Sequence, residues 1–245
     1  MILKIERDKG KYEIVLVEGP EHNIKYSTLS HCWGNEQPLT TTTTTLHSRK
    51  MRIDWETLPK TFQDAIIISA SLDVNYIWID SLCILQDDKT DWASESVKMG
   101  LIYQNSWLTI AAAAAPDRTF GCFPAPKDIK EYDLKYGSNG DSLTRIYARK
   151  VRAPIDSREH LEKLNNHLPL FHRAWVFQER LLAYRILYLC EDEMVFECAT
   201  YSRCECSGPY TEKVLQRYEG TKYSGLKFRF HGLLNQWHSH KYFST

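Results

Sequence analysis

The sequence has no excess of charge of either sign, because 31 lysines and arginines are balanced by 31 aspartates and glutamates. Proteins that bind nucleic acid usually present a basic surface, so we expect no nucleic-acid partner. No stretch approaches the roughly 18 uncharged apolar residues of a membrane helix. The N-terminus also lacks the apolar core of a signal peptide. We therefore expect a soluble, cytoplasmic protein with no membrane partner.

Several common site signatures are missing as well. The seven cysteines include no CxxC motif, which argues against a disulfide framework and fits a reducing compartment. Cys198, Cys204 and Cys206 lie close together, but their spacing fits no zinc pattern well, so we interpret them as free thiols and expect no metal. Neither GxGxxG nor GxxxxGK[ST] occurs, so a Rossmann dinucleotide site or a P-loop is not indicated.

Strand and helix patterns alternate along the first half of the chain. Apolar and β-branched stretches predict strands at 12–17, 25–32, 76–85 and 107–115. Helical stripes predict helices at 58–73 and from about 91 to 105, with Thr61 and Asp64 forming a capping box and Asp91 as the second cap. The threonine run at 39–46 predicts a surface loop or irregular edge. The alternation predicts an α/β fold with a parallel sheet and right-handed crossovers.

The second half of the chain is less regular. Residues 116–170 are interrupted by prolines and glycines and are interpreted as an insertion. A helix is predicted at 173–183 and strands across 185–198, followed by a C-terminal extension over about 199–245. We therefore expect a single domain over 1–245, with core blocks at 26–115 and 173–198.

Three blocks then stand in order: YSTLSHCWG at 26–34, LPKTFQDA through LTIAAAAA at 58–115, and RAWVFQERLLAYRILYLCEDEMVFEC at 173–198. They closely resemble the fungal heterokaryon-incompatibility (HET) domain family, whose blocks look like LSYCWG, YLWIDSLCIIQDD and RGWTLQERLLSPR. The resemblance implies a role in non-self recognition and cell death after fusion of genetically unlike hyphae. The ending NQWHSHKYFST looks like the start of a further family segment, so we expect a short member or a fragment.

HET domains are in turn similar to Toll/interleukin-1 receptor (TIR) domains. That similarity implies a flavodoxin-like parallel sheet flanked by helices, whose first strand ends near Leu29-Ser30-His31. Enzymatic TIR domains carry a Trp-Cys-x-x-Glu helix, and Trp175 and Glu179 have the same spacing, with Val176 replacing cysteine. The similarity implies NAD as candidate substrate, cleaved at its nicotinamide–ribose bond without a further cofactor, by a homo-oligomer or with a partner signalling domain.

Cleavage of that bond passes through a cation like that of glycoside hydrolysis. A carboxylate beside the ribose can stabilise this cation, and nicotinamide leaves as a neutral molecule, so one glutamate is enough. We assign Glu179 this catalytic role. The alternative is a structural salt bridge of Glu179 with one of the nearby arginines, Arg173, Arg180 or Arg185. Arg180 is also a candidate for orienting the site.

Glu95 is the rival glutamate, because Trp92 precedes it at helical spacing. It follows the second sheet strand rather than the third, which is the wrong place for the TIR-type glutamate. We therefore interpret Glu95 as a residue of the helix surface.

The stretch LSHCWG closes the first core strand, at the edge where ligands of open parallel sheets bind. We expect pocket contacts from the five residues Ser30, His31, Cys32, Trp33 and Gly34, with Trp33 stacking on a ring and Gly34 admitting close backbone approach. Adjacent residues point to opposite faces of a strand, so His31 and Cys32 are not expected to form a nucleophile–base pair.

Asp80 lies within an apolar run, where an unbonded carboxylate is costly. We expect Asp80 and Ser81 to contact a ligand, as does Trp175 from its helix. The alternative for Asp80 is a buried carboxylate bonded to backbone amides or to Arg173.

The leading hypothesis is therefore a cell-death effector that cleaves NAD. The alternative is a non-enzymatic signalling module that acts through self-association or partner contact, because TIR-type folds serve both uses. A third, weaker hypothesis is an enzyme acting on another small molecule through Cys32 or Asp80.

Overall fold

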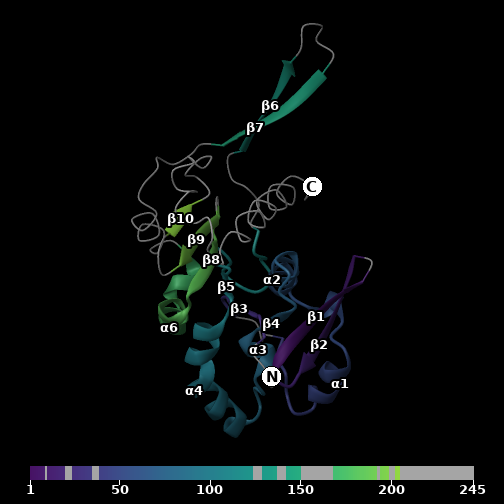
Figure 1. The fold of residues 1–245 in the computed structure, drawn as a ribbon, viewed down its shortest axis with the longest axis vertical. Coiled ribbons are helices and arrows are strands. Elements are labelled where there is room, and N and C mark those ends of the chain that lie inside the picture. Colours follow the sequence, from purple (N-terminus) through teal and green to yellow (C-terminus); the bar gives the residue numbers. More distant parts are fainter. Residues whose placement is uncertain are drawn as a thin grey trace.

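The computed structural model describes residues 1–8, 10–19, 24–34, 39–123, 129–136, 142–149, 168–191, 194–198 and 202–204. The strands of its main sheet are β1 (Ile2–Asp8), β2 (Lys11–Val17), β3 (Ser27–Ser30), β4 (Tyr76–Trp78), β5 (Leu108–Ala111), β8 (Arg185–Leu189), β9 (Met194–Cys198) and β10 (Ser202–Cys204). They are ordered β10-β9-β8-β5-β3-β4-β1-β2 across the sheet (Figure 1).

The centre of this sheet is parallel. β3 pairs in parallel with β4 on one side and with β5 on the other, and β5 pairs in parallel with β8. The order β4-β3-β5-β8 is 2-1-3-4 in chain order, as in flavodoxin-like doubly wound sheets. The predicted α/β fold is thus confirmed. Antiparallel strands extend both edges, β1 and β2 at one and β9 and β10 at the other, so the whole sheet is mixed.

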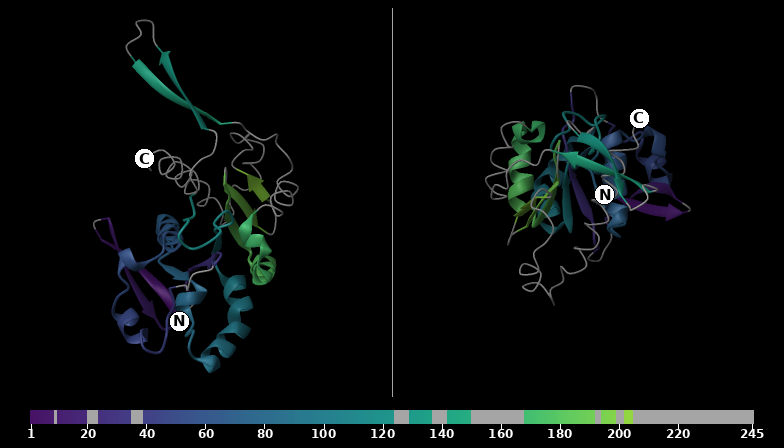
Figure 2. Two further views of the ribbon diagram at one scale, coloured as in Figure 1. Left: turned by 180° about the vertical axis from the view of Figure 1, so that it is seen from behind. Right: turned by 90° about the horizontal axis from the view of Figure 1, so that it is seen from above.

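Helices cover both faces of the sheet. They are α1 (Leu46–Met51), α2 (Lys60–Ser71), α3 (Asp80–Cys83), α4 (Lys89–Asn105) and α6 (Ala174–Leu182), with short 3-10 turns η1 (Trp55–Thr57) and η2 (Pro169–His172). The crossover through α2 runs in one direction along the sheet, and those through α4 and α6 run in the other. Right-handed crossovers therefore place α2 on one face and α4 and α6 on the opposite face, as Figure 2 shows.

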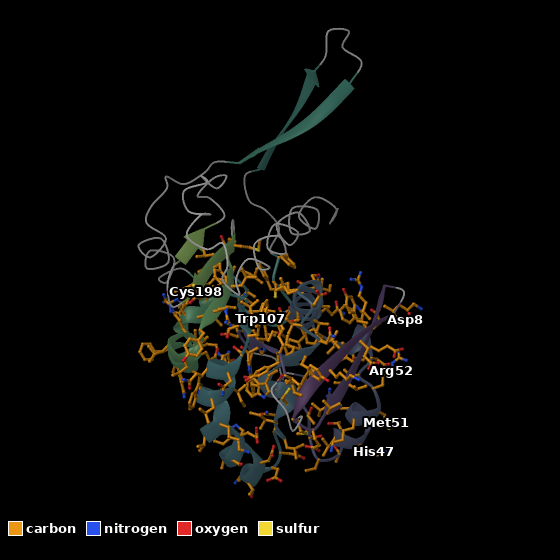
Figure 3. The ribbon with its side chains drawn as sticks, in the orientation of Figure 1. Asp8, His47, Met51, Arg52, Trp107 and Cys198 are labelled. Carbon is orange, nitrogen blue, oxygen red and sulfur yellow. The ribbon has the colours of Figure 1, made fainter. Side chains whose placement is uncertain are left out.

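Two apolar clusters hold these layers together. Figure 3 draws the side chains that lie between and around the sheet and its helices. In the larger one, Phe62 and Ile66 of α2 pack with Leu29 of β3 and Ile110 of β5. The smaller one lies under α6 and includes Val176, with Ile186 and Tyr188 of β8, Leu170 of η2 and Cys32. Burial of such side chains drives the layers together, and it places the N-terminal half of α6 against the end of β3.

Several local predictions differ from the structure. The strand predicted at 76–85 ends at Trp78, because the chain turns into α3, where the Asp80 carboxylate accepts the amide of Ser81 at 2.7 Å. The threonine run is only partly on the surface: Thr41 is fully buried and bridges to Leu85. In a run of identical threonines, the sequence does not show which one will be buried.

The predicted caps also differ. Pro59 is the N-cap of α2, and Asp88 caps α4 by accepting the amides of Thr90 and Asp91. Thr61 and Asp64 instead bond the segment that follows β5, where they accept the amides of Gly121 and Cys122 at 3.1 and 2.8 Å. The predicted capping box is therefore wrong, because these side chains serve a tertiary contact.

The insertion predicted at 116–170 contains a hairpin of β6 (Ile129–Tyr136) and β7 (Ser142–Arg149). This hairpin is separate from the main sheet and extends away from it (Figure 1). Residues 150–167 and the extension from 205 onward lie outside the described residues.

We expect Asp64→Ala to lower the free energy of unfolding by about 1–3 kcal/mol, because it leaves the buried amide of Cys122 without an acceptor. Urea denaturation measures this loss. The matched control is Asp87→Ala, which removes exposed bonds to Thr43 that water can replace. Equal losses in the two variants would contradict the assigned anchoring role of Asp64.

Candidate functional site

The carboxyl ends of β3 and β5 lie side by side where the chain order of the sheet reverses. Ser30, the last residue of β3, is in register with Ala111, the last residue of β5. Ligands of doubly wound sheets bind outside such a switch point. The stretch LSHCWG begins at this edge, as the sequence predicted.

Helix α6 places Glu179 against the same edge. Only 4% of this residue is exposed, and its carboxylate accepts a hydrogen bond from the Ser30 hydroxyl. The hydroxyl of Tyr103 in α4 donates to the carbonyl of Leu29 at 3.2 Å and also faces the Glu179 carboxylate. Three elements, β3, α4 and α6, thus meet around one carboxyl group.

The surroundings of Glu179 change its ionisation. Burial raises the pKa of Glu179 from 4.5 to about 7, and the nearby carboxylate of Asp80 acts in the same direction. The bond from Ser30, the charge of Arg173 and the Tyr103 hydroxyl oppose this shift without cancelling it. A carboxyl group that titrates near neutrality at such an edge is a functional-site candidate.

The arginines that the sequence offered as partners of Glu179 make other contacts. Arg173 donates to the carbonyl of His31, and Arg185 donates to the carbonyl of Trp107 at 2.9 Å. The guanidinium of Arg180 lies 3.7 Å from the carboxylate of Glu197. Arg173 still favours the ionised form of Glu179 through its charge. The hydrogen bond that holds the Glu179 side chain comes from Ser30.

Asp80 occupies the neighbouring part of the edge, just beyond β4. One carboxylate oxygen accepts the amide of Ser81 at 2.7 Å, and the other accepts the indole N–H of Trp33 at 3.0 Å. The backbone bond agrees with the structural interpretation of Asp80, and the partial exposure of the residue leaves it accessible to a ligand. Contact of Asp80 and Trp33 with a ligand stays a prediction.

His31 and Cys32 lie on opposite sides of the chain. His31 packs edge-on against Phe62 of α2 at a ring separation of 5.0 Å, whereas Cys32 joins the apolar cluster under α6. Burial lowers the pKa of His31 to about 4 and raises the pKa of the Cys32 thiol. A neutral imidazole and a protonated thiol on opposite sides do not form a nucleophile–base pair.

Three buried side-chain polar atoms have no hydrogen-bond partner in the described part of the chain: Trp78 Nε1 at the end of β4, and His31 Nε2 and Ser81 Oγ just beyond β3 and β4. An unsatisfied buried polar atom costs stability and calls for an explanation. His31 belongs to the segment that leaves the parallel strand β3, and Ser81 to the segment that leaves β4. A polar group of a ligand or an ordered water at the edge would satisfy them.

A small cavity lies beside Glu179. Its walls come from β3, β5, η2, α6 and β8 and include Ser30, Thr109, Leu170 and Tyr188. The cavity measures about 10 Å³, which is room for about one water molecule. A nicotinamide ring does not fit into a space of this size.

The remaining candidate residues, Trp175, Glu95 and Arg180, take different positions. Trp175 is 51% exposed on α6, and Glu95 pairs with Lys98 at 2.8 Å on the surface of α4. Arg180 lies over the rings of Phe171 and Tyr188 and lines the small cavity beside Glu179. Trp175 and Glu95 therefore lie on the surface, whereas Arg180 borders the cavity beside the Glu179 carboxylate.

Two residues near the edge were not assigned to the site from the sequence. Tyr103 fits a helical stripe, but no local pattern shows that its hydroxyl meets Glu179. Arg118 donates to the carbonyl of Trp33 at 3.4 Å from the segment after β5, within the irregular insertion.

No cluster of three or more His, Cys, Asp or Glu side chains suited to a metal ion occurs in the described ranges, and Cys206 lies outside them. In the described part of the chain, no helix is both long and apolar enough to cross a membrane.

The fold and its edge define a doubly wound α/β domain with a buried glutamate at its switch point. The model of the family described as "Heterokaryon incompatibility protein (HET)" matches residues 26–179, more than half of the chain. The chain therefore belongs to the HET family, which confirms the resemblance and supports a cell-death role in heterokaryon incompatibility. Searches of curated proteins and of solved structures found no significant match.

Gly34 has a structural requirement at this edge. Its φ is +77°, and a Cβ there would lie 2.6 Å from the Cβ of Asp117. Gly10 has a similar φ of +83° but open space around it.

We expect Gly34→Ala to cost about 3 kcal/mol of unfolding free energy and Gly10→Ala about 1 kcal/mol, because only the first adds a clash to the strain. Urea denaturation compares them, and equal costs would contradict the close contact with Asp117.

Glu179→Gln should change the dependence of stability on pH. Because the folded pKa of Glu179 is raised to about 7 from 4.5, the native state binds more protons than the unfolded state between these values. Stability from this group is therefore present below about pH 4.5 and lost as pH rises toward 7 and above. When the pH is raised from about 4 to 8, we expect the free energy of unfolding of Glu179→Gln to rise by about 3 kcal/mol relative to that of the parent protein. Urea denaturation at the two pH values measures this difference. A difference that does not change with pH would contradict the raised pKa.

Proposed function

We propose that this domain hydrolyses the nicotinamide–ribose bond of NAD and thereby acts as a cell-death effector of fungal heterokaryon incompatibility. The observation that supports this proposal most directly is the buried Glu179 carboxyl group at the switch point, bonded to Ser30 and titrating near pH 7. The unsatisfied atoms of His31 and Ser81 at the same edge also favour a polar ligand.

In the proposed reaction, the bond between ribose C1′ and the ring nitrogen breaks, and its electron pair goes to the nitrogen. Nicotinamide leaves as a neutral molecule, and the ribose becomes an oxocarbenium-like cation. The ionised Glu179 carboxylate stabilises this cation. Water then adds to C1′ and loses a proton, for which the same carboxylate is the nearest base. The products are nicotinamide and ADP-ribose.

The charge of the substrate assists this role of Glu179. The nicotinamide ring of NAD carries a positive charge, and an opposite charge within a few ångströms lowers the pKa of a carboxyl group. Binding therefore favours the ionised form that the reaction needs. Ser30 acts as a positioning residue, because its hydroxyl fixes one carboxylate oxygen.

Access of substrate requires a change of this closed arrangement. The cavity beside Glu179 has room for only about one water molecule, so α6 or the edge above β3 must move before ribose can reach the carboxylate. A movement of α6 away from β3 would break the Ser30–Glu179 hydrogen bond.

The test is nicotinamide release from NAD by the purified chain at high protein concentration. We expect Glu179→Gln to lower kcat/KM at least about 100-fold, because the cation loses its counter-charge. The matched control is Glu95→Gln on α4, which should retain activity. In the parent protein kcat/KM should rise with pH through about 7 and then level off, and the inflection in kcat should lie lower. Equal activity of the two variants would contradict the role of Glu179.

The small cavity favours a second candidate function, a non-enzymatic signalling module in which the Ser30–Glu179 bond is purely structural. Two results together would select it. The concentrated parent protein would release no nicotinamide, and expressed Glu179→Gln protein would still kill cells.

A further inference from the structure

Exposed apolar side chains gather on one surface of α4 and α6. Val97 and Leu101 of α4 and Phe177 and Leu181 of α6 are between 59% and 83% exposed. Surface hydrophobic residues are normally scattered singly, whereas adjoining ones mark interaction sites. We call these four residues the apolar ridge.

The four side chains of the apolar ridge border one seam between the helices. Gly100 of α4 faces Gln178 and Leu182 of α6, since a Cβ on Gly100 would lie 3.1 Å from Leu182 and 3.2 Å from Gln178. At about 100° per residue, Val97 and Leu101 lie on one flank of Gly100.

Phe177 and Leu181 lie on one flank of Gln178 by the same periodicity. The seam has a side toward the sheet and a side toward solvent. Both pairs are exposed, so both flank the solvent side (Figure 1 shows the two helices adjacent).

Charges at the border of the apolar ridge are neutralised within the chain. Lys98 pairs with Glu95 at 2.8 Å, and Arg180 lies 3.7 Å from Glu197. The other ionisable residue of α6, Glu179, is turned inward and buried. The ridge therefore presents no net charge that would select a charged partner or repel a second copy, and the chain as a whole is also neutral.

We propose that the apolar ridge is the interface through which two copies of this chain associate. In a two-fold contact the same patch meets itself, so an uncharged apolar surface is complementary to its own copy. Association removes the four ridge side chains of each copy from water, which is favourable. The inference rests on these contacts and does not depend on the NAD reaction.

The full chain is tested by sedimentation velocity over about 1 to 200 µM, a range that reveals dimers of micromolar affinity. The parent protein should dimerise, and Phe177→Ser combined with Leu181→Ser should raise the dissociation constant at least about tenfold. Leu101→Lys, which changes the ridge on α4, should also raise the dissociation constant at least about tenfold. The matched control is Met51→Ser on α1, which is 70% exposed but away from the ridge and should leave the dissociation constant unchanged.

Circular dichroism verifies that each variant is folded, which is expected because all the changed residues are exposed. A parent protein that stays monomeric over the whole range overturns the proposal, and so does a dimer that the ridge variants do not weaken. Equal weakening by Met51→Ser also overturns it, because association would then be non-specific. Nicotinamide release has no part in this experiment, so failure here is distinct from failure of the proposed reaction.

Discussion

The hydrogen bond from Ser30 to Glu179 is the interaction on which the rest of the site depends. It joins residues 149 positions apart, one at the end of the first parallel strand and one on the helix that leads to the last. A carboxyl group with so little exposure is stable only when a donor meets it. Because the bond crosses the switch point, it fixes the middle of α6 over the carboxyl ends of β3 and β5, and with it the size of the cavity beneath.

The same bond balances two opposing effects on the Glu179 carboxyl group. Burial favours the neutral acid, whereas the Ser30 hydroxyl and the charge of Arg173 favour the carboxylate. With a pKa of about 7, a modest change in the surroundings decides which form is present. A cationic ligand would supply such a change, which is why a closed and partly protonated site in the free protein is compatible with a reaction that needs the ionised form.

The parallel sheet, the helix at 173–183 and the position of LSHCWG at a strand end could be predicted, because each is encoded in a local pattern of apolar, glycine and helix-forming residues. The remaining features depend on long-range contacts. Thr61 and Asp64 match a capping box locally but bond the segment after β5. Tyr103 fits a buried stripe, yet its meeting with Glu179 depends on how α4 packs on α6. Asp80 ends the strand at 76–78 early because its carboxylate binds the next amide and Trp33, and an apolar run does not show this.

The packing of α4 on α6 connects the inner and outer surfaces of these helices. Gly100 lets the helices approach closely, and that approach brings Tyr103 of α4 and Glu179 of α6 to the same point at the sheet. The solvent side of the same seam carries the apolar ridge, with Phe177 and Leu181 on the helix that holds Glu179. A nine-residue helix moves as a unit because its backbone bonds are internal. A contact that holds the outer face of α6 would therefore also restrict where the Glu179 carboxylate can lie relative to Ser30, so the proposed association would be coupled to the geometry of the site.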